Sequence, residues 1–329
     1  MKIINPLIIV LALIALAYFG VQIGLTALFA VVIPYVAIAV FLIGFIYKVI
    51  NWAKSPVPFR IPTTAGQQKS LPWFQQNKLD NPSSTLGVII RMALEILLFR
   101  SLFRNTEAEV TKEGKVLFSS SKWLWLGGLV FHWSFLIILL RHSRFFLEPV
   151  PGLITILEKG DSMMQVGVPL FYLTDGAILV AVTYLFIRRV VVPQMKYLSQ
   201  PADYFPLYLI LSIVITGVLM RYFIRVDVVG IKSLARGLVT FRPTIPDGLG
   251  ALFYIHLFLV SILAIYFPFS KLMHLGGVFL SPTRNMANNN RIVRHINPWN
   301  PDIKIRTYEE YENDYRENMK KVGLPVDKE

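Results

Sequence analysis

Long apolar runs, separated by polar and basic segments, organise this chain of 329 residues. A helix needs about 20 mainly apolar residues to cross a hydrocarbon core. The pattern reaches that length in Asn5–Leu25, Leu28–Trp52, Trp123–Phe146, Val168–Ile187, Tyr204–Phe223 and Gly250–Phe279. The first two belong to one continuous run that is too long for a single crossing, so it must fold back near residues 22–30. The pattern predicts an all-α integral membrane bundle of six transmembrane helices.

The polar segments divide the chain into four expected units. These are two N-terminal transmembrane helices (1–52), a Pro-rich loop with an interfacial helix (53–120), a four-helix core (121–279) and a polar tail (280–329). Charged residues interrupt the apolar ones in Thr85–Arg104, which favours a helix in the membrane interface, with a seventh span as the alternative. A loop is expected at Leu147–Val166, a short basic connection at Val190–Asp203, a longer polar connection at Ile224–Asp247 and a turn at Thr111–Lys115.

Composition supports a membrane protein, since 54% of the residues are hydrophobic and only 16% are charged. The net charge of +13 does not indicate a nucleic-acid partner, because the basic residues lie between apolar spans instead of forming one patch. Most Lys and Arg fall in the two termini and alternate loops, so both termini are expected on the cytoplasmic side of the cell membrane. Lys2 and the run after it also suit a signal peptide; a membrane anchor is the preferred reading.

Four of the chain's five histidines lie in two of the predicted spans. His132 and His142 are ten residues apart, and His256 and His274 are 18 residues apart, five turns on one helix face. An imidazole at membrane depth needs a partner. With six spans these two helices run antiparallel, so His132 meets His274 on the cytoplasmic side and His142 meets His256 on the outer side. Because the chain has no cysteine, two non-covalently bound b-type haems, each held by one pair, are the preferred hypothesis.

Two other classes of function remain open at this point. The histidines can form a proton relay in a channel or transporter, although neither histidine-bearing span contains Asp or Glu. Alternatively, the chain is a haem-free anchor that docks a soluble enzyme through its Pro-rich loop and tail. His274 is close enough to the tail to reach the interface, and His295 is expected on the surface of the tail.

The segments FHWSFLIILLRHSRFF and YIHLFLVSILAIYFPFSKLMHLGGVF resemble the haem-bearing helices of the NarI family, the di-haem cytochrome b (gamma) subunits of respiratory nitrate reductases. IPYVAIAVFLIGFIYK is similar to that family's first span, which makes Asn5–Leu25 an additional helix. The Pro-rich SPVPFRIPTTAGQQKSLPWF resembles the DsrM branch, the NarI-like subunits of DsrMKJOP membrane complexes.

The resemblance implies a cytochrome b with two b haems that exchanges electrons between menaquinone or menaquinol and a cytoplasmic iron–sulfur partner like heterodisulfide reductase, in sulfur or sulfite respiration. It also implies a second quinone-interacting membrane subunit, a periplasmic multihaem cytochrome c and a periplasmic iron–sulfur subunit. In the family a loop lysine contributes to the quinone site, and Lys159 is the nearest match. Arg141 is a candidate for the same site or for a haem propionate, and Lys271 and Arg221 for a propionate.

Overall fold

The computed structural model describes all residues except 56, 58–59, 62–65, 163–169, 290–304 and 329. The first half of the chain contains α1 (Ile4–Gln22), α2 (Ile33–Ala53), α3 (Thr85–Leu98), α4 (Arg100–Phe103), β1 (Thr106–Val110), β2 (Val116–Ser120) and α5 (Lys122–His142). The second half contains α6 (Gly152–Asp161), α7 (Leu173–Val191), α8 (Pro193–Leu198), α9 (Pro201–Val218), α10 (Val228–Val239), α11 (Ala251–Tyr266), α12 (His274–Leu280) and α13 (Tyr308–Lys321). Short π-helical segments precede α2 (Leu28–Val32) and follow α9 (Leu219–Ile224).

The expected helical membrane bundle is confirmed. In the part of the chain that the structure describes, five helical segments are long and apolar enough to cross a membrane: Ile4–Gln22, Leu28–Ala53, Lys122–Phe145, Pro201–Ile224 and Ala251–Phe269. The sixth expected span corresponds to α7, which has 19 residues but includes Asp175, Arg188 and Arg189. Its predicted start at Val168 lies outside the described residues. The count of six spans therefore stays a prediction.

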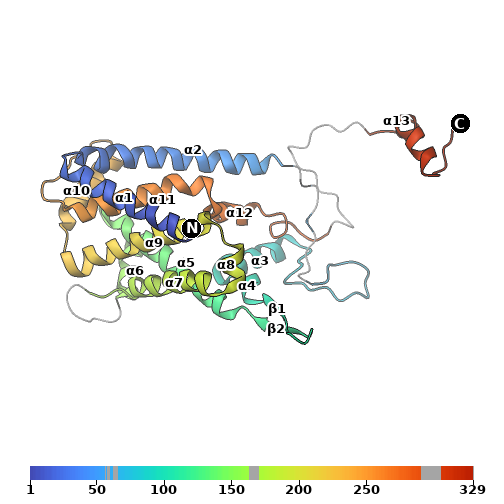
Figure 1. The fold of residues 1–329 in the computed structure, drawn as a ribbon, viewed down its shortest axis with the longest axis horizontal. Helices are drawn as coiled ribbons and strands as arrows, with labels where there is room; N and C mark the ends of the chain where they lie inside the picture. Colours follow the sequence, from blue (N-terminus) through green and yellow to red (C-terminus); the bar gives the residue numbers. More distant parts are fainter. Residues whose placement is uncertain (56, 58–59, 62–65, 163–169, 290–304, 329) are drawn as a thin grey trace.

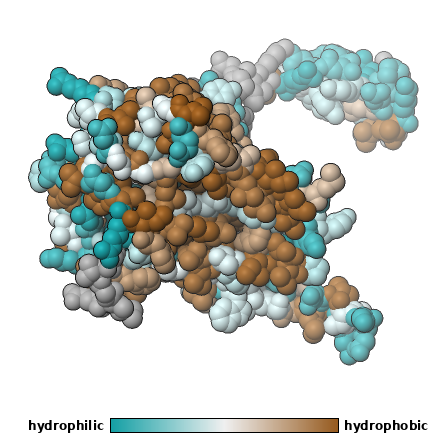
Figure 2. Space-filling model, turned by 60° about the vertical axis from the view of Figure 1, so that its left-hand side comes forward, coloured by the Kyte–Doolittle hydropathy of each residue, from teal (hydrophilic) through white to brown (hydrophobic). Residues whose placement is uncertain are grey.

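The outer surface of the bundle is apolar. Large side chains such as Phe19, Ile43 and Val180 are more than half exposed, and hydrophobic residues cover a broad area of the face in Figure 2. Lipid is the environment in which such a surface is stable, because exposed apolar patches of this size are rare in soluble monomers. The structure thus supports a multi-pass membrane protein.

The bundle has two ends with different elements (Figure 1). At the α12 end lie α3, α4, α8 and α12, and Lys2 donates to the Tyr197 carbonyl oxygen of α8. At the α6 end lie α6 and α10, where Lys232 of α10 pairs with Glu148. The helices α5, α7, α9 and α11 connect the two ends, with α7 packed against both α5 and α9. The amino end and the start of the tail are thus at the same end of the bundle.

The three expected connections contain helices. Residues 147–166 include α6, residues 224–247 include α10, and residues 190–203 include α8. The expected loop at 147–166 is thus partly helical, and both α6 and α10 bury one apolar side of a short amphipathic helix. Ile154 of α6 and Leu234 of α10 are the buried anchors.

The segment before α5 differs in detail from the expected interfacial helix and turn. Ser84 caps α3 by accepting the Gly87 N–H at 3.3 Å, as its position suggests. The helix expected to reach Arg104 breaks at Phe99, whose φ is +50°, so α4 starts in a new direction. The turn at residues 111–115 is present, and β1 and β2 flank it as an antiparallel hairpin. The hairpin is an exception to the all-α fold.

The last membrane segment is not one helix, which corrects the expectation for Gly250–Phe279. α11 ends at Tyr266, Pro268 lies in a 3-10 turn, and Ser270 is extended at φ −125° and ψ 177°. Proline removes a backbone donor and hinders continuation of a helix, and Ser270 then caps the next turn by accepting the Leu272 N–H at 3.2 Å. His256 and His274 therefore lie on two separate helices, so their spacing in the sequence does not place them on one helix face.

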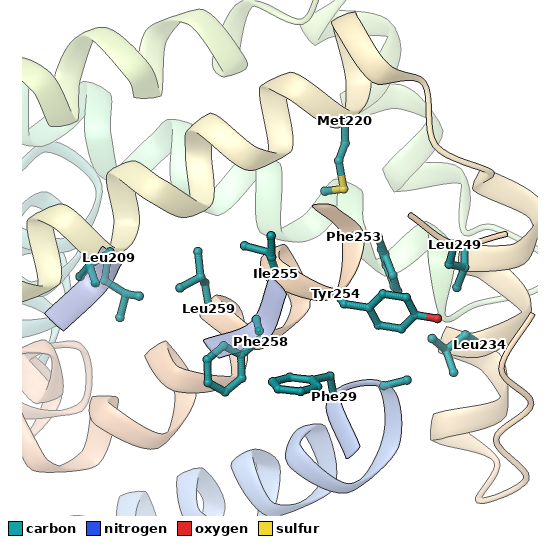
Figure 3. Close-up of a cluster of buried hydrophobic side chains, with 13 residues drawn as sticks. Phe29, Leu209, Met220, Leu234, Leu249, Phe253, Tyr254, Ile255, Phe258 and Leu259 are labelled. Atoms are coloured by element: carbon teal, nitrogen blue, oxygen red, sulfur yellow. The ribbon is translucent and has the colours of Figure 1, made fainter. Parts of the chain in front are cut away.

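The core of the bundle forms around α11 (Figure 3). Phe258 and Leu259 of α11 are buried with Leu209 of α9, and Phe29 contacts the Phe258 ring edge-to-face at 5.2 Å between centroids. A Cβ at Gly20 of α1 would lie 2.4 Å from the Phe29 ring, so only glycine permits this approach. The packing fixes α11, and with it the position of His256.

We expect Phe258→Ala to reduce the free energy of unfolding by about 3–5 kcal/mol, since it leaves a cavity beside Phe29. Denaturant unfolding in mixed micelles measures this change. Phe269→Ala is the matched control, because its ring is 73% exposed, and an equal loss from both variants would contradict the assignment of the core.

Candidate cofactor site

Two histidines from different elements meet toward the α12 end. The imidazoles of His132 on α5 and His274 at the start of α12 have centroids 5.8 Å apart and planes at 81°. His132 also contacts Phe99 and Phe131 edge-to-face, at 5.0 Å and 5.1 Å between centroids. The break at Ser270 thus brings His274 to the position that the antiparallel arrangement predicts for the partner of His132.

The second pair lies toward the α6 end. His142 is the last residue of α5, and His256 is in the second turn of α11. The two imidazoles lie within range of an electrostatic interaction. A Cβ at Gly217 of α9 would lie 3.4 Å from His256 Cε1, so the small residue permits close packing of α9 on this ring. The backbones of α5 and α11 do not pack closely in the part of the chain that the structure describes.

The four imidazoles share one hydrogen-bonding pattern. Nδ1 lies 2.7 Å from the Gly128 carbonyl oxygen in His132, 2.7 Å from that of Ile138 in His142, and 2.8 Å from that of Lys271 in His274. A carbonyl only accepts, so Nδ1 carries the proton in each ring and Nε2 keeps the lone pair. His256 Nδ1 lies 2.8 Å from Thr216 Oγ1, whose own proton goes to a carbonyl of α9, at Ser212 or Ile213.

This donor set fits an axially bound haem. A neutral imidazole whose Nδ1–H is bound to a carbonyl is the usual form of a metal-ligating histidine. A metal about 2 Å from one nitrogen of each ring places the centroids about 6 Å apart, close to the 5.8 Å between His132 and His274. Among the described residues no group of three or more His, Cys, Asp and Glu residues has metal-binding geometry. Two histidines are enough where a porphyrin supplies the other four ligands.

A buried polar network lies beside the His142 pair. Arg141, only 7% exposed, places Nη1 3.1 Å from Asp161 Oδ2 and Nη2 2.5 Å from Asp175 Oδ1. Its guanidinium lies 3.8 Å from the centroid of the Tyr172 ring, and that of Arg221 lies 4.0 Å from the same ring. We call these five residues, together with Thr174 and Tyr222, the Arg141 network.

Hydrogen bonds connect the rest of the Arg141 network. Tyr222 Oη donates to Asp175 Oδ2 at 2.8 Å and accepts the Tyr172 N–H at 3.0 Å. Asp161 accepts from both the backbone N–H and the hydroxyl of Thr174. Nε of Arg141 and Nε of Arg221 are buried and make no hydrogen bond with the described residues. The network therefore combines two balanced ion pairs with unused donors.

The other sequence-predicted residues have different surroundings. Lys159 is exposed on α6, away from the side that buries Asp161. Lys271 pairs with Asp203 at 2.6 Å through an exposed side chain, and Arg221 belongs to the Arg141 network. His295 lies outside the described residues. The sequence analysis missed Asp161 and Asp175, because it searched for acids only in the two histidine spans. The available signal for Asp175 was an acidic residue in the first turn of an otherwise apolar span, as in α7.

A helical membrane bundle whose histidines are drawn from different helices is the arrangement expected of a membrane cytochrome of the b type. Residues 86–295 match the family described as "Nitrate reductase gamma subunit". The match covers more than half of the chain. The chain therefore belongs to the nitrate reductase gamma subunit family, as the histidine-bearing segments predict.

Two curated relatives extend this result. The chain is 44% identical over 281 residues to the "Hdr-like menaquinol oxidoreductase cytochrome b-like subunit" of Archaeoglobus fulgidus, covering 83% of this chain and 84% of the relative. It is 42% identical over 280 residues to the protein of the same name from Archaeoglobus profundus, covering 83% of each. They support the expected DsrM-like subunit and show that the chain is a cytochrome b-like membrane subunit.

We expect Arg141→Ala to destabilise the protein by about 3–5 kcal/mol, because it leaves Asp161 and Asp175 buried without their cation. Denaturant unfolding in mixed micelles measures the loss. Arg144→Ala is the control: the Arg144–Glu158 pair is more exposed, and such pairs contribute about 0–1 kcal/mol. Equal effects of the two variants would show that the Arg141 network is not a structural ion-pair cluster.

Proposed function

We propose that the chain is the di-haem cytochrome b subunit of a menaquinol oxidoreductase. In this proposal it exchanges electrons between the menaquinone pool and a cytoplasmic iron–sulfur partner like heterodisulfide reductase. The observation that carries it is the set of four histidines, each with Nδ1 hydrogen-bonded to the protein and Nε2 left as a ligand. The names of the relatives supply the quinol and the partner.

Each histidine pair has a defined role in this proposal. His132 and His274 hold the cytoplasmic-side haem, and His142 and His256 hold the outer-side haem. When bound, the two haems supply one-electron carriers between the two faces of the membrane. The protein orients the ligands: Gly128, Ile138 and Lys271 fix three imidazoles through their carbonyl groups, and Thr216 fixes the fourth through its hydroxyl group. Residues 121–279 then form the di-haem core, and both termini are cytoplasmic.

The quinone site is proposed at the Arg141 network, with Lys159 as the alternative. Arg141 adjoins His142, and the unused Nε donors of Arg141 and Arg221 suit the carbonyl oxygen of a quinone. Asp175 and Tyr222 are polar groups that a quinol hydroxyl can contact. The exposed position of Lys159 offers no comparable enclosure, so the geometry favours Arg141.

The remaining partners follow from the DsrM-like assignment alone. They are a second quinone-interacting membrane subunit, a periplasmic multihaem cytochrome c and a periplasmic iron–sulfur subunit, acting together in sulfur or sulfite respiration. The elements available for the cytoplasmic partner are those outside the bundle at the α12 end: the Pro-rich segment, the β1–β2 hairpin and the tail. Co-purification from the native membrane, followed by identification of the bound chains, tests these assignments.

The purified protein should contain two b-type haems, seen in its reduced-minus-oxidised spectrum and counted against the protein concentration. His132→Ala and His274→Ala should each remove one haem, and the double variant should remove no more than that one. Combining His132→Ala with His256→Ala should remove both haems, because the pairs differ.

The fifth histidine provides the matched control, since His295→Ala should keep two haems. A single variant of the four ligands that retains two haems would contradict the pairing. A colourless wild-type protein would instead favour a histidine proton relay or a haem-free anchor.

Arg141→Lys should slow haem reduction by a menaquinol analogue roughly 10–100-fold, since a charged hydrogen bond contributes about 1.5–3 kcal/mol and lysine lacks the planar fork. Stopped-flow spectroscopy measures the rate, and reduction by dithionite should be unchanged. A slow Lys159→Ala variant beside a normal Arg141→Lys variant would move the quinone site to the exposed side of α6.

A further inference from the structure

A second group of arginines lies on elements next to the other histidine pair and contains more arginines than carboxylates among the described residues. It consists of Arg60, Arg91, Arg100, Arg104 and Arg284, with Asp80 and Glu95, and is called the arginine cluster below. Arg100 and Arg104 both bind the Asp80 carboxylate, and Arg284 lies 3.9 Å from Glu95. Five guanidinium groups against two carboxylates leave an excess of three positive charges.

Among the described residues, the two innermost members of the arginine cluster form no close ion pair, although Glu95 lies one turn from Arg91 on α3 and interacts with its charge. Arg60 is 2% exposed and Arg91 is 5% exposed. Both donate to the backbone carbonyl of Asp80, and Arg60 also donates to that of Thr283 at 3.0 Å. Nη1 of Arg60 is buried and makes no hydrogen bond with the described residues. Burial and the charge of Arg91 lower the pKa of Arg60 to about 10.

The elements that provide the arginine cluster also contact His132 or follow directly after the helix that begins at His274. Arg91 is on α3 and Arg100 on α4, and Phe99 between these helices contacts the His132 ring at 5.0 Å. Trp133, next to His132, donates from Nε1 to the Leu97 carbonyl oxygen at 3.0 Å. The carbonyl of Thr283, which Arg60 binds, follows α12, the helix that begins at His274.

We propose that the arginine cluster binds the two propionate carboxylates of the haem that His132 and His274 hold. The proposal rests on the haem assignment made above. Two propionates bring two negative charges to a buried excess of three positive ones, and a guanidinium binds a carboxylate through paired hydrogen bonds. Arg60 and Arg91 are the innermost contacts. The residues expected for this role, Lys271 and Arg221, lie 2.6 Å from Asp203 and 4.0 Å from Asp175, respectively.

Redox titration of the full-length membrane protein tests the role of Arg60. In Arg60→Gln the midpoint potential of the haem that depends on His132 should fall, because a lost positive charge destabilises the reduced form. Its potential should also become more dependent on pH, since the propionate pKa rises without the cation. The haem that depends on His142 should keep its potential. Arg60→Lys, which keeps the charge, should restore most of the shift.

Infrared difference spectroscopy with haem labelled at the propionate carbons provides a second readout. The labelled carboxylate bands should shift in Arg60→Gln and in Arg91→Gln, so the test does not depend on one variant folding. Arg306→Gln is the control, because it removes an arginine from an exposed ion pair with Asp314. Its potentials and bands should match the wild type.

Several results would overturn the proposal while leaving the two-haem assignment intact. The clearest result would be that Arg60→Gln and Arg91→Gln both retain two haems, with the midpoint potentials and the propionate bands of the wild type. Loss of a bound phospholipid from these variants, with the haem bands unaltered, would assign the cluster to a lipid phosphate. A wild-type protein without haem would instead refute the proposed function itself.

Discussion

An imidazole inside a membrane must find partners for both of its nitrogens, and the arrangement of this bundle follows from that constraint. All four histidines of the bundle bind the protein through Nδ1, three of them to a carbonyl within four residues. The remaining nitrogen of each ring then has to be satisfied across the bundle. In the proposed function, a haem shared by two helices meets this need for two rings at once.

The sequence was sufficient for the helical membrane bundle, because apolar length is a local property. The role of the four histidines as haem ligands stays a prediction. The path of the last segment was not predictable in the same way. Its length suggested one helix, whereas Pro268 and Ser270 end α11 and start a new turn at Lys271. The spacing of five turns between His256 and His274 predicted that both lie on one face of a single helix. The bend at Pro268 and Ser270 sets the position of His274 instead. The ring contact between His132 and His274 depends on that bend.

The Arg141 network shows a second limit of sequence reasoning. Arg141 stood out as a cation at membrane depth, and its partners lie on α6 and α7, which were taken for a loop and an ordinary span. Such partners become visible only once three elements are placed together. The helices α1 and α2 lie outside the matched family range of 86–295, yet they pack against α11. Part of the support for His256 therefore comes from residues beyond that range.

The two ends of the bundle differ in how their buried charge is balanced. Beside His142, two arginines face two carboxylates, so the Arg141 network is neutral and can remain stable without a charged ligand. Beside His132, five arginines face two carboxylates among the described residues, and a buried excess of this kind needs compensating anions. A neutral site suits a quinone, which enters and leaves uncharged. A cationic site suits a permanently bound anion, because loss of the anion would leave the arginines to repel one another. In the proposed function, the Arg141 network is therefore the site that exchanges quinone, and the arginine cluster is the site that retains the haem propionates.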